Sequence, residues 1–165
     1  MNPAYSFHRE VNVNITASPT EVFALLNDHR RLASHMEKPS LMMAGATMHI
    51  ETDSQKGQAL GSLMRIQGKV LGIPLSVEEV VCEYTPPFGK TWETQGEPHL
   101  LVIGKYRMGF KLEPVQNMTR LCVWLDYDLP TRRLPWLGKR LAKVYADWCV
   151  KRMSSDAVYV FKCYL

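Results

Sequence analysis

Residues 7–23 read FHREVNVNITASPTEVF and contain the two patterns from which the fold can be predicted. Apolar and polar residues alternate from the start of this stretch to Ala17, and a period of two indicates a half-buried strand. The strand stops where Ser18 can cap a helix, Pro19 suits the first helical position and Glu21 can bond back to the capping residue. The sequence therefore predicts a strand that is followed at once by a helix.

The rest of the chain predicts one more short helix, six further strands and a long terminal helix. The short helix is expected through His29–His35, and the strands at residues 41–52, 62–71, 75–84, 90–95, 100–112 and 119–129. From Leu134 to about Phe161 the period changes to 3.6, which indicates an amphipathic helix. Its expected apolar stripe comprises Leu137, Leu141, Val144, Tyr145, Trp148 and Tyr159. We expect an α+β fold, in which a curved, seven-stranded antiparallel sheet buries one face against the terminal helix.

Size and composition indicate a single globular domain over residues 1–165. The mass of 18.9 kDa allows one complete core, and 46% hydrophobic with 22% charged residues is unlike a disordered or fibrous chain. The longest stretch without a charged residue, Pro39–Ile50, is too short to span a bilayer. No secretory signal is visible in the sequence, so we expect a cytoplasmic location.

The cysteine and charge patterns limit which cofactors and partners can be expected. The four cysteines form no pair with zinc-site spacing, so we expect reduced thiols, no metal and no cofactor. The net charge of +4 is uneven, because residues 132–152 hold seven basic residues against one acid, which leaves −2 for everything else. The basic residues of this segment either keep the outer side of the terminal helix in contact with water, or they contact an anionic membrane surface. Because the outward strand faces mix both signs, nucleic acid is not an expected partner.

Four local motifs resemble one known group of proteins. They are VNITASPTEVF at residues 13–23, VCEYTPP at residues 81–87 before Trp92, FKLEP at residues 110–114, and Leu129-Pro130 before the last helix. The order of elements and these motifs resemble the START-like superfamily, also described as the polyketide cyclase/dehydratase and lipid-transport (SRPBCC) group. The resemblance implies a helix-grip fold, with ligands held between the bent sheet and the helix. Its members include cyclases, carriers and lipid sensors, so the resemblance does not select one reaction.

The alternation and the helix phase predict which side chains point inward. Besides Arg9, the candidate ligand-binding residues are Met48, Ile50, Met64, Trp92, Thr94, Tyr106, Met108, Phe110, Tyr127, Tyr145, Trp148 and Arg152. This set is aromatic and rich in methionine, which suits an apolar, ring-shaped ligand oriented by hydroxyl groups. The alternative is that these side chains simply fill a core.

Three functions follow from this set. The first is binding of a hydrophobic small molecule, either lipid or aromatic and polyketide-like. The second is a polyketide cyclase or dehydratase in which Tyr106 and Tyr127, with Arg9 or Arg152, act as acid and base groups. The third is a peripheral membrane lipid carrier. No Ser-His pair is evident, and the adjacent acids Glu78 and Glu79 are expected to be solvated strand positions. The oligomeric state is left open.

Overall fold

The computed structural model describes residues 4–28, 47–70, 72–130 and 138–162, which form two helices and seven strands. In chain order they are β1 (Phe7–Ile15), α1 (Pro19–Asn27), β2 (Thr47–Thr52), β3 (Leu63–Val70), β4 (Ile73–Thr85), β5 (Gly89–His99), β6 (Tyr106–Val115), β7 (Met118–Tyr127) and α4 (Gly138–Lys162). The second short helix expected at residues 29–35 lies outside the described residues.

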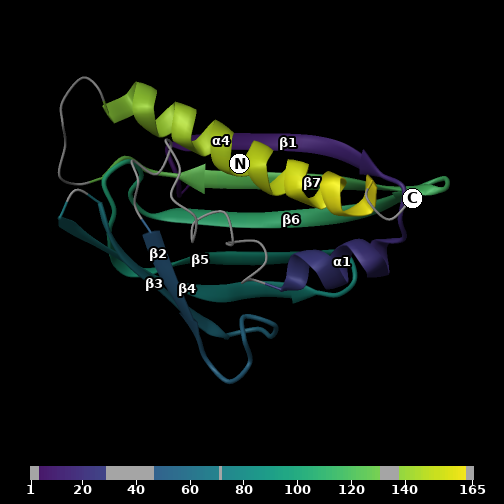
Figure 1. Ribbon diagram of the computed structural model, residues 1–165, viewed down its shortest axis with the longest axis horizontal. Coiled ribbons are helices and arrows are strands. Elements are labelled where there is room, and N and C mark those ends of the chain that lie inside the picture. The colour runs from purple at the N-terminus through teal and green to yellow at the C-terminus, as the bar shows by residue number, and fades with distance from the viewer. Residues whose placement is uncertain (1–3, 29–46, 71, 131–137, 163–165) are drawn as a thin grey trace.

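All seven strands form one antiparallel sheet in the order β1-β7-β6-β5-β4-β3-β2. The sheet is open, because β1 and β2 are its two edges and do not pair with each other. Helix α4 lies along β1 and β7 at one side of the sheet, while α1 packs beside β6 (Figure 1). The helix-grip architecture expected from the sequence is confirmed.

The strand register divides the sheet into an inner face, which meets α4, and an outer face. Val11 lies opposite Val123, which lies opposite Phe110, which lies opposite Lys90, so this row runs across four strands on the inner face. Two shifts of register occur in the pairing of β4 with β5, one after Ser76 and one after Val81. Such bulges increase the local bend and twist of a sheet. They help the sheet to curve toward the helix.

The predicted start of α1 is confirmed in detail. The Ser18 hydroxyl accepts a bond from the Glu21 amide at 3.3 Å, and the Glu21 carboxylate accepts the Ser18 amide at 2.8 Å. The hydrogen bonds from Ser18 lower the pKa of the Glu21 carboxyl. From this start the helix buries Val22, Phe23 and Leu26 against the sheet.

Helix α4 meets the sheet through small side chains rather than through the predicted stripe. Its most buried residues are Ala142, Ala146, Val150, Met153 and Ala157. Three residues of the predicted stripe, Leu141, Val144 and Tyr159, are instead exposed, and Leu137 lies outside the described residues. The expected helix is therefore present but turned about its axis, because alanines let it approach β1 and β7 more closely than larger side chains would.

Strand boundaries differ from the prediction mainly between β5 and β6. β5 continues to His99, and residues 100–105 form a connection instead of the expected start of a strand. The amide of Gly104 donates to the Asp128 carbonyl at 2.8 Å, and a β-carbon at position 104 would lie 2.6 Å from the Leu129 carbonyl oxygen. This close approach holds the connection against the end of β7. No helix in the described part of the chain is long and apolar enough to cross a membrane.

The capping box makes a first prediction about stability. We expect Ser18→Ala to lower the free energy of unfolding by about 1 kcal/mol, because the first turn of α1 loses its capping oxygen. Urea unfolding followed by circular dichroism measures this. Thr20→Ala, on the exposed side of the same turn, is the matched control and is expected to raise stability by a few tenths of a kcal/mol. Equal effects of the two substitutions would contradict the capping role.

Candidate functional site

The inner face brings together the sheet residues that the sequence predicted to point inward. The register places nine of the twelve candidate residues on this face: Met48, Ile50, Met64, Trp92, Thr94, Tyr106, Met108, Phe110 and Tyr127. Thr94 and Met108 are half-buried, and the other seven are buried. Tyr106 and Tyr127 are direct neighbours across β6 and β7, and Tyr127 stacks on Phe7 with ring centroids 5.3 Å apart.

A buried carboxylate lies within this apolar wall. Glu79 projects from the inner face of β4 and is only 2% exposed. The Tyr106 hydroxyl, from β6, donates a short hydrogen bond to it. Burial, with the nearby Glu79 charge as the next cause, raises the pKa of Tyr106 well above its ordinary value. The Tyr106 hydroxyl is therefore a permanent donor near neutral pH.

The edge of α4 that faces this carboxylate contributes two more polar groups. Tyr145 and Cys149, one helical turn apart, share a side-chain hydrogen bond, and both act electrostatically on Tyr106. The charge that Cys149 would carry and burial raise the pKa of Tyr145 well above its ordinary value. Burial raises the pKa of the Cys149 thiol to about 12. Glu79, Tyr106, Tyr145 and Cys149 thus form one polar cluster between sheet and helix, which we call the inner polar cluster.

A buried lysine lies further along the same face. Lys90 on β5 is 1% exposed, and its ammonium donates to the Asn27 carbonyl at 3.3 Å, at the C-terminal end of α1. The ammonium also lies 5.7 Å from the centre of the Trp92 ring. Burial lowers the pKa of Lys90 to about 8, against the opposing effect of the Glu79 and Asp28 charges. Because helix C-termini favour cations, this lysine ties α1 to the sheet.

The predicted inward arginines are both engaged by acids of α4. Arg9 does lie on the inner face, and its Nε is 2.9 Å from the Asp147 carboxylate. Arg152 was expected on the buried stripe of the helix, and this placement is wrong: it is exposed and pairs with Asp156 one turn later at 3.2 Å. The changed phase of α4 is the reason. Trp148 is half-buried, with its ring 5.8 Å from that of Tyr145.

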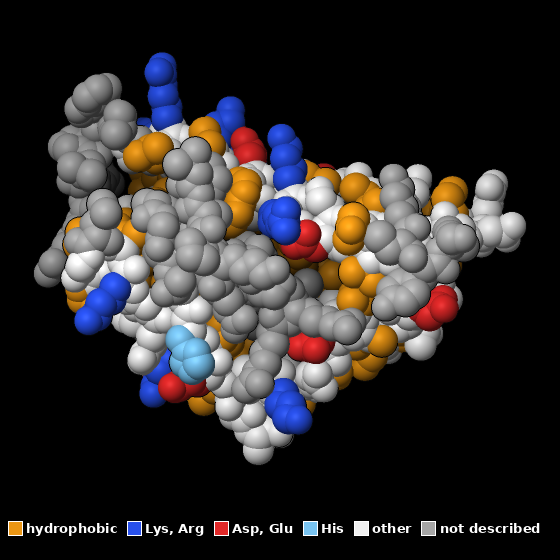
Figure 2. Space-filling view, in the orientation of Figure 1, with side chains coloured by type: hydrophobic (Ala, Val, Ile, Leu, Met, Phe, Trp, Pro, Cys, Tyr) orange, Lys and Arg blue, Asp and Glu red, His pale blue; other side chains and the backbone are white. Residues whose placement is uncertain are grey.

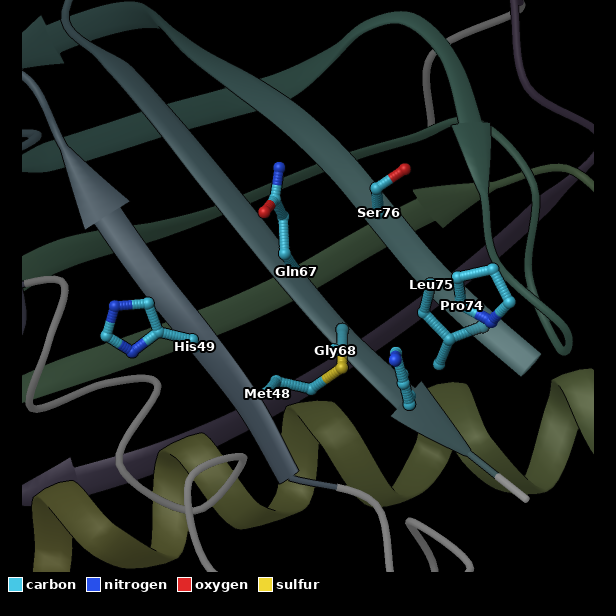
Figure 3. Close-up of a pocket in the computed structure, with 8 residues that line it drawn as sticks. Met48, His49, Gln67, Gly68, Pro74, Leu75 and Ser76 are labelled. Carbon is cyan, nitrogen blue, oxygen red and sulfur yellow. The ribbon is translucent and has the colours of Figure 1, made fainter. Parts of the chain in front are cut away.

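An open groove of about 930 Å³ crosses β2, β3 and β4. It is lined by Met48, His49, Gln67, Gly68, Lys69, Pro74, Leu75 and Ser76. Gln67 and Ser76 project to the same side of their strands, and the pairing places His49, Gln67 and Ser76 in one row on the outer face (Figure 3). Of the predicted ligand residues, Met48 alone lines it. The same pairing places Met48, Gly68 and Leu75 in a row on the inner face, so the groove takes residues from both faces and shares none with the inner polar cluster.

The described residues show no group of three or more His, Cys, Asp or Glu side chains that could hold a metal ion. Cys82, Cys122 and Cys149 are free thiols and are partly buried. Cys163 lies outside the described residues.

Two charged residues of the inner face, Glu79 and Lys90, were missed by the sequence prediction. Glu79 was expected to be solvated, but it has the same strand parity as the buried Val77 and Val81. Lys90 has the same parity as Trp92. A charged residue in phase with apolar neighbours is the signal that could have identified both.

No protein-family model matches the chain, and no curated protein matches it either. Solved structures do resemble it. TTHA0849 from Thermus thermophilus is 13% identical, with a TM-score of 0.68 over 95% of this chain and 98% of that one. Ara h 8.0201 is also 13% identical, with a TM-score of 0.60 over 93% and 98% of the two chains.

A third structure is the di-domain ARO/CYC BexL from the BE-7585A biosynthetic pathway. It is 12% identical, with a TM-score of 0.60, and the match covers 93% of this chain but 46% of BexL. At identities of 12–13% these structures show the fold alone, and the helix-grip fold predicted for this chain is confirmed.

The buried lysine makes a prediction about pH. The pKa of Lys90 is about 8 in the folded chain, against an ordinary value of 10.5. Between these values the unfolded chain binds more protons, so raising the pH favours folding. Relative to Lys90→Met, we expect the wild type to gain about 2 kcal/mol of stability between pH 7 and pH 9.5. Urea unfolding of both proteins measures this, and a difference that is independent of pH would contradict it. Because Cys149 and the tyrosines are common to both proteins, their titration cancels.

Proposed function

We propose that this protein binds a hydrophobic small molecule, lipid-like or aromatic and polyketide-like, between the inner face of the sheet and α4. The observation that carries this proposal is the inner polar cluster. A carboxylate buried in an apolar wall costs free energy, and groups with strongly shifted pKa values concentrate at functional sites. Glu79 and its hydroxyl neighbours lie where the ligands of this fold are expected.

The chemistry of the cluster suggests what the ligand carries. The Tyr106 and Tyr145 hydroxyls remain protonated near neutral pH, because their pKa values are raised. They supply donors, and the Glu79 carboxylate supplies acceptors. We therefore expect a mainly apolar ligand with at least one hydroxyl or carbonyl group that exchanges hydrogen bonds with this cluster.

The surrounding wall fits the apolar part of such a ligand. Met48, Met64 and Met108 line the inner face together with Trp92 and Phe110. Methionine side chains adapt to irregular shapes, and aromatic rings provide flat contact surfaces. Met108 is half-buried despite its central position on the inner face, which leaves part of it available to a ligand.

A substitution that fills the inner space tests this proposal. We expect Met108→Trp to reduce the uptake of an apolar fluorescent probe, 1-anilinonaphthalene-8-sulfonate, by at least tenfold, because the indole occupies volume next to Trp92. Lys111→Trp is the matched control, since Lys111 is exposed on the outer face of the same strand. Equal uptake by both variants would place the probe elsewhere. Native mass spectrometry of freshly purified protein should show a bound apolar molecule.

The hydrogen-bonded pair of Tyr106 and Glu79 favours an enzymatic second candidate. Ring closure of a linear poly-ketone needs one group to take a proton from carbon and another to give one to the accepting carbonyl oxygen. We propose Glu79 and Tyr106 for these two roles, because they are joined by a hydrogen bond within the inner face. The arginines considered for this chemistry are paired with Asp147 and Asp156 instead.

The enzymatic candidate predicts separate losses of turnover and binding. We expect Tyr106→Phe to lower the cyclisation rate of a linear poly-ketone thioester by about 100-fold or more, because the proton donor is lost. The affinity of this variant for 1-anilinonaphthalene-8-sulfonate should change by less than threefold. Absorbance of the aromatic product measures the rate. If the wild type gives no product above the uncatalysed rate, the enzymatic candidate is wrong while the binding proposal stands.

A further inference from the structure

The side of α4 that faces away from the sheet exposes apolar residues among basic ones. Leu141 and Val144, three positions apart on the helix, are 47% and 53% exposed. Residues three or four apart lie on the same side of a helix, so the two side chains are neighbours. The core contact of α4 is made by other residues, from Ala142 to Ala157, so this pair forms a second apolar surface that the described core does not cover.

Basic side chains surround this pair. Arg140 and Lys143 adjoin it, Lys139 lies at the start of the helix, and Lys151 lies two turns after Val144. All four are exposed, and within the described part of the chain none of them forms an ion pair or a side-chain hydrogen bond. Figure 2 shows Lys and Arg side chains interleaved with hydrophobic ones along the upper edge of the molecule, over α4.

The nearby acids do not neutralise this surface. Asp147 is engaged by Arg9 of β1, and Asp156 is engaged by Arg152. The surface formed by Lys139, Arg140, Leu141, Lys143, Val144 and Lys151, which we call the α4 outer patch, therefore carries an uncompensated positive charge around an apolar centre.

We propose that the α4 outer patch docks on an anionic membrane surface. The basic side chains meet lipid phosphates, and Leu141 and Val144 enter the interface between headgroups and acyl chains. Peripheral helices combine these two contributions, because apolar burial and attraction to anionic lipid add. The apolar centre favours a membrane over nucleic acid, because a phosphate backbone offers Leu141 and Val144 no apolar surface to contact. The proposal does not depend on the ligand site.

Co-sedimentation with vesicles tests the proposal. We expect the wild type to bind vesicles of equal phosphatidylglycerol and phosphatidylcholine in 50 mM salt, and to bind more weakly in 500 mM salt or on phosphatidylcholine alone. Each basic residue near such a surface contributes about 1 kcal/mol, so the double variant Lys143→Gln with Lys151→Gln should bind about 30-fold more weakly. Leu141→Gln should weaken binding at both salt concentrations, because its effect is not electrostatic.

Matched controls separate this surface from net charge. Lys69→Gln with Lys111→Gln removes the same charge from exposed positions on the strands and should leave vesicle binding within twofold of the wild type. All substituted positions are exposed, and melting temperatures confirm that each variant is folded. The proposal is overturned if the wild type does not bind anionic vesicles in 50 mM salt, or if the two double variants lose affinity equally. It is also overturned if the wild type binds duplex DNA as tightly as it binds the anionic vesicles and Leu141→Gln does not weaken the binding to DNA.

Discussion

The contact of α4 with β1 and β7 determines where everything else on the inner face can lie. Ala142, Ala146 and Ala157 have short side chains, so the helix backbone comes close to the sheet at this side. The Arg9–Asp147 pair lies at the same contact and fixes the helix against β1. Because α4 lies over β1 and β7, the inner face of the central strands is adjacent to the side of the helix that carries Tyr145 and Cys149. The inner polar cluster exists only because the helix has this position.

Most of the strand faces could be predicted from the sequence, because a period of two leaves few alternatives. Once Met64, Tyr106 or Tyr127 is assigned to a face, each second residue of its strand follows. The two bulges of β4 bend the sheet without moving Glu79 or Val81 from the inner face. The start of α1 was predictable for a similar reason, since a capping box is a local structure that does not depend on tertiary contacts.

The rotation of α4 could not be predicted, because the helix offers two apolar stripes. Leu141 and Val144 are more hydrophobic than alanine, so periodicity alone favours burying them. Close packing of the helix against β1 and β7 favours the alanines instead, and that contact is tertiary. The prediction of inward-facing residues assumed that charged side chains are exposed to water, and for this reason it missed Glu79 and Lys90. Each of them is stabilised by a specific neighbour: the Tyr106 hydroxyl for the carboxylate and the C-terminal end of α1 for the ammonium.

The two proposals made for this chain rest on that single rotation. With the alanines against the sheet, the helix directs Tyr145 and Cys149 toward Glu79, and it directs Leu141 and Val144 into solvent. Turning the helix to bury Leu141 would remove the alanines from the contact with β1 and β7 and would take Leu141 out of the α4 outer patch. In the observed orientation, the proposed ligand site and the proposed membrane-docking surface lie on neighbouring parts of one helix, because Leu141 precedes Tyr145 by four residues. If both proposals hold, a lipid-like ligand enters the site from the membrane on which the protein is docked. The carrier hypothesis is then compatible with the proposed binding site, because no residue has to serve both.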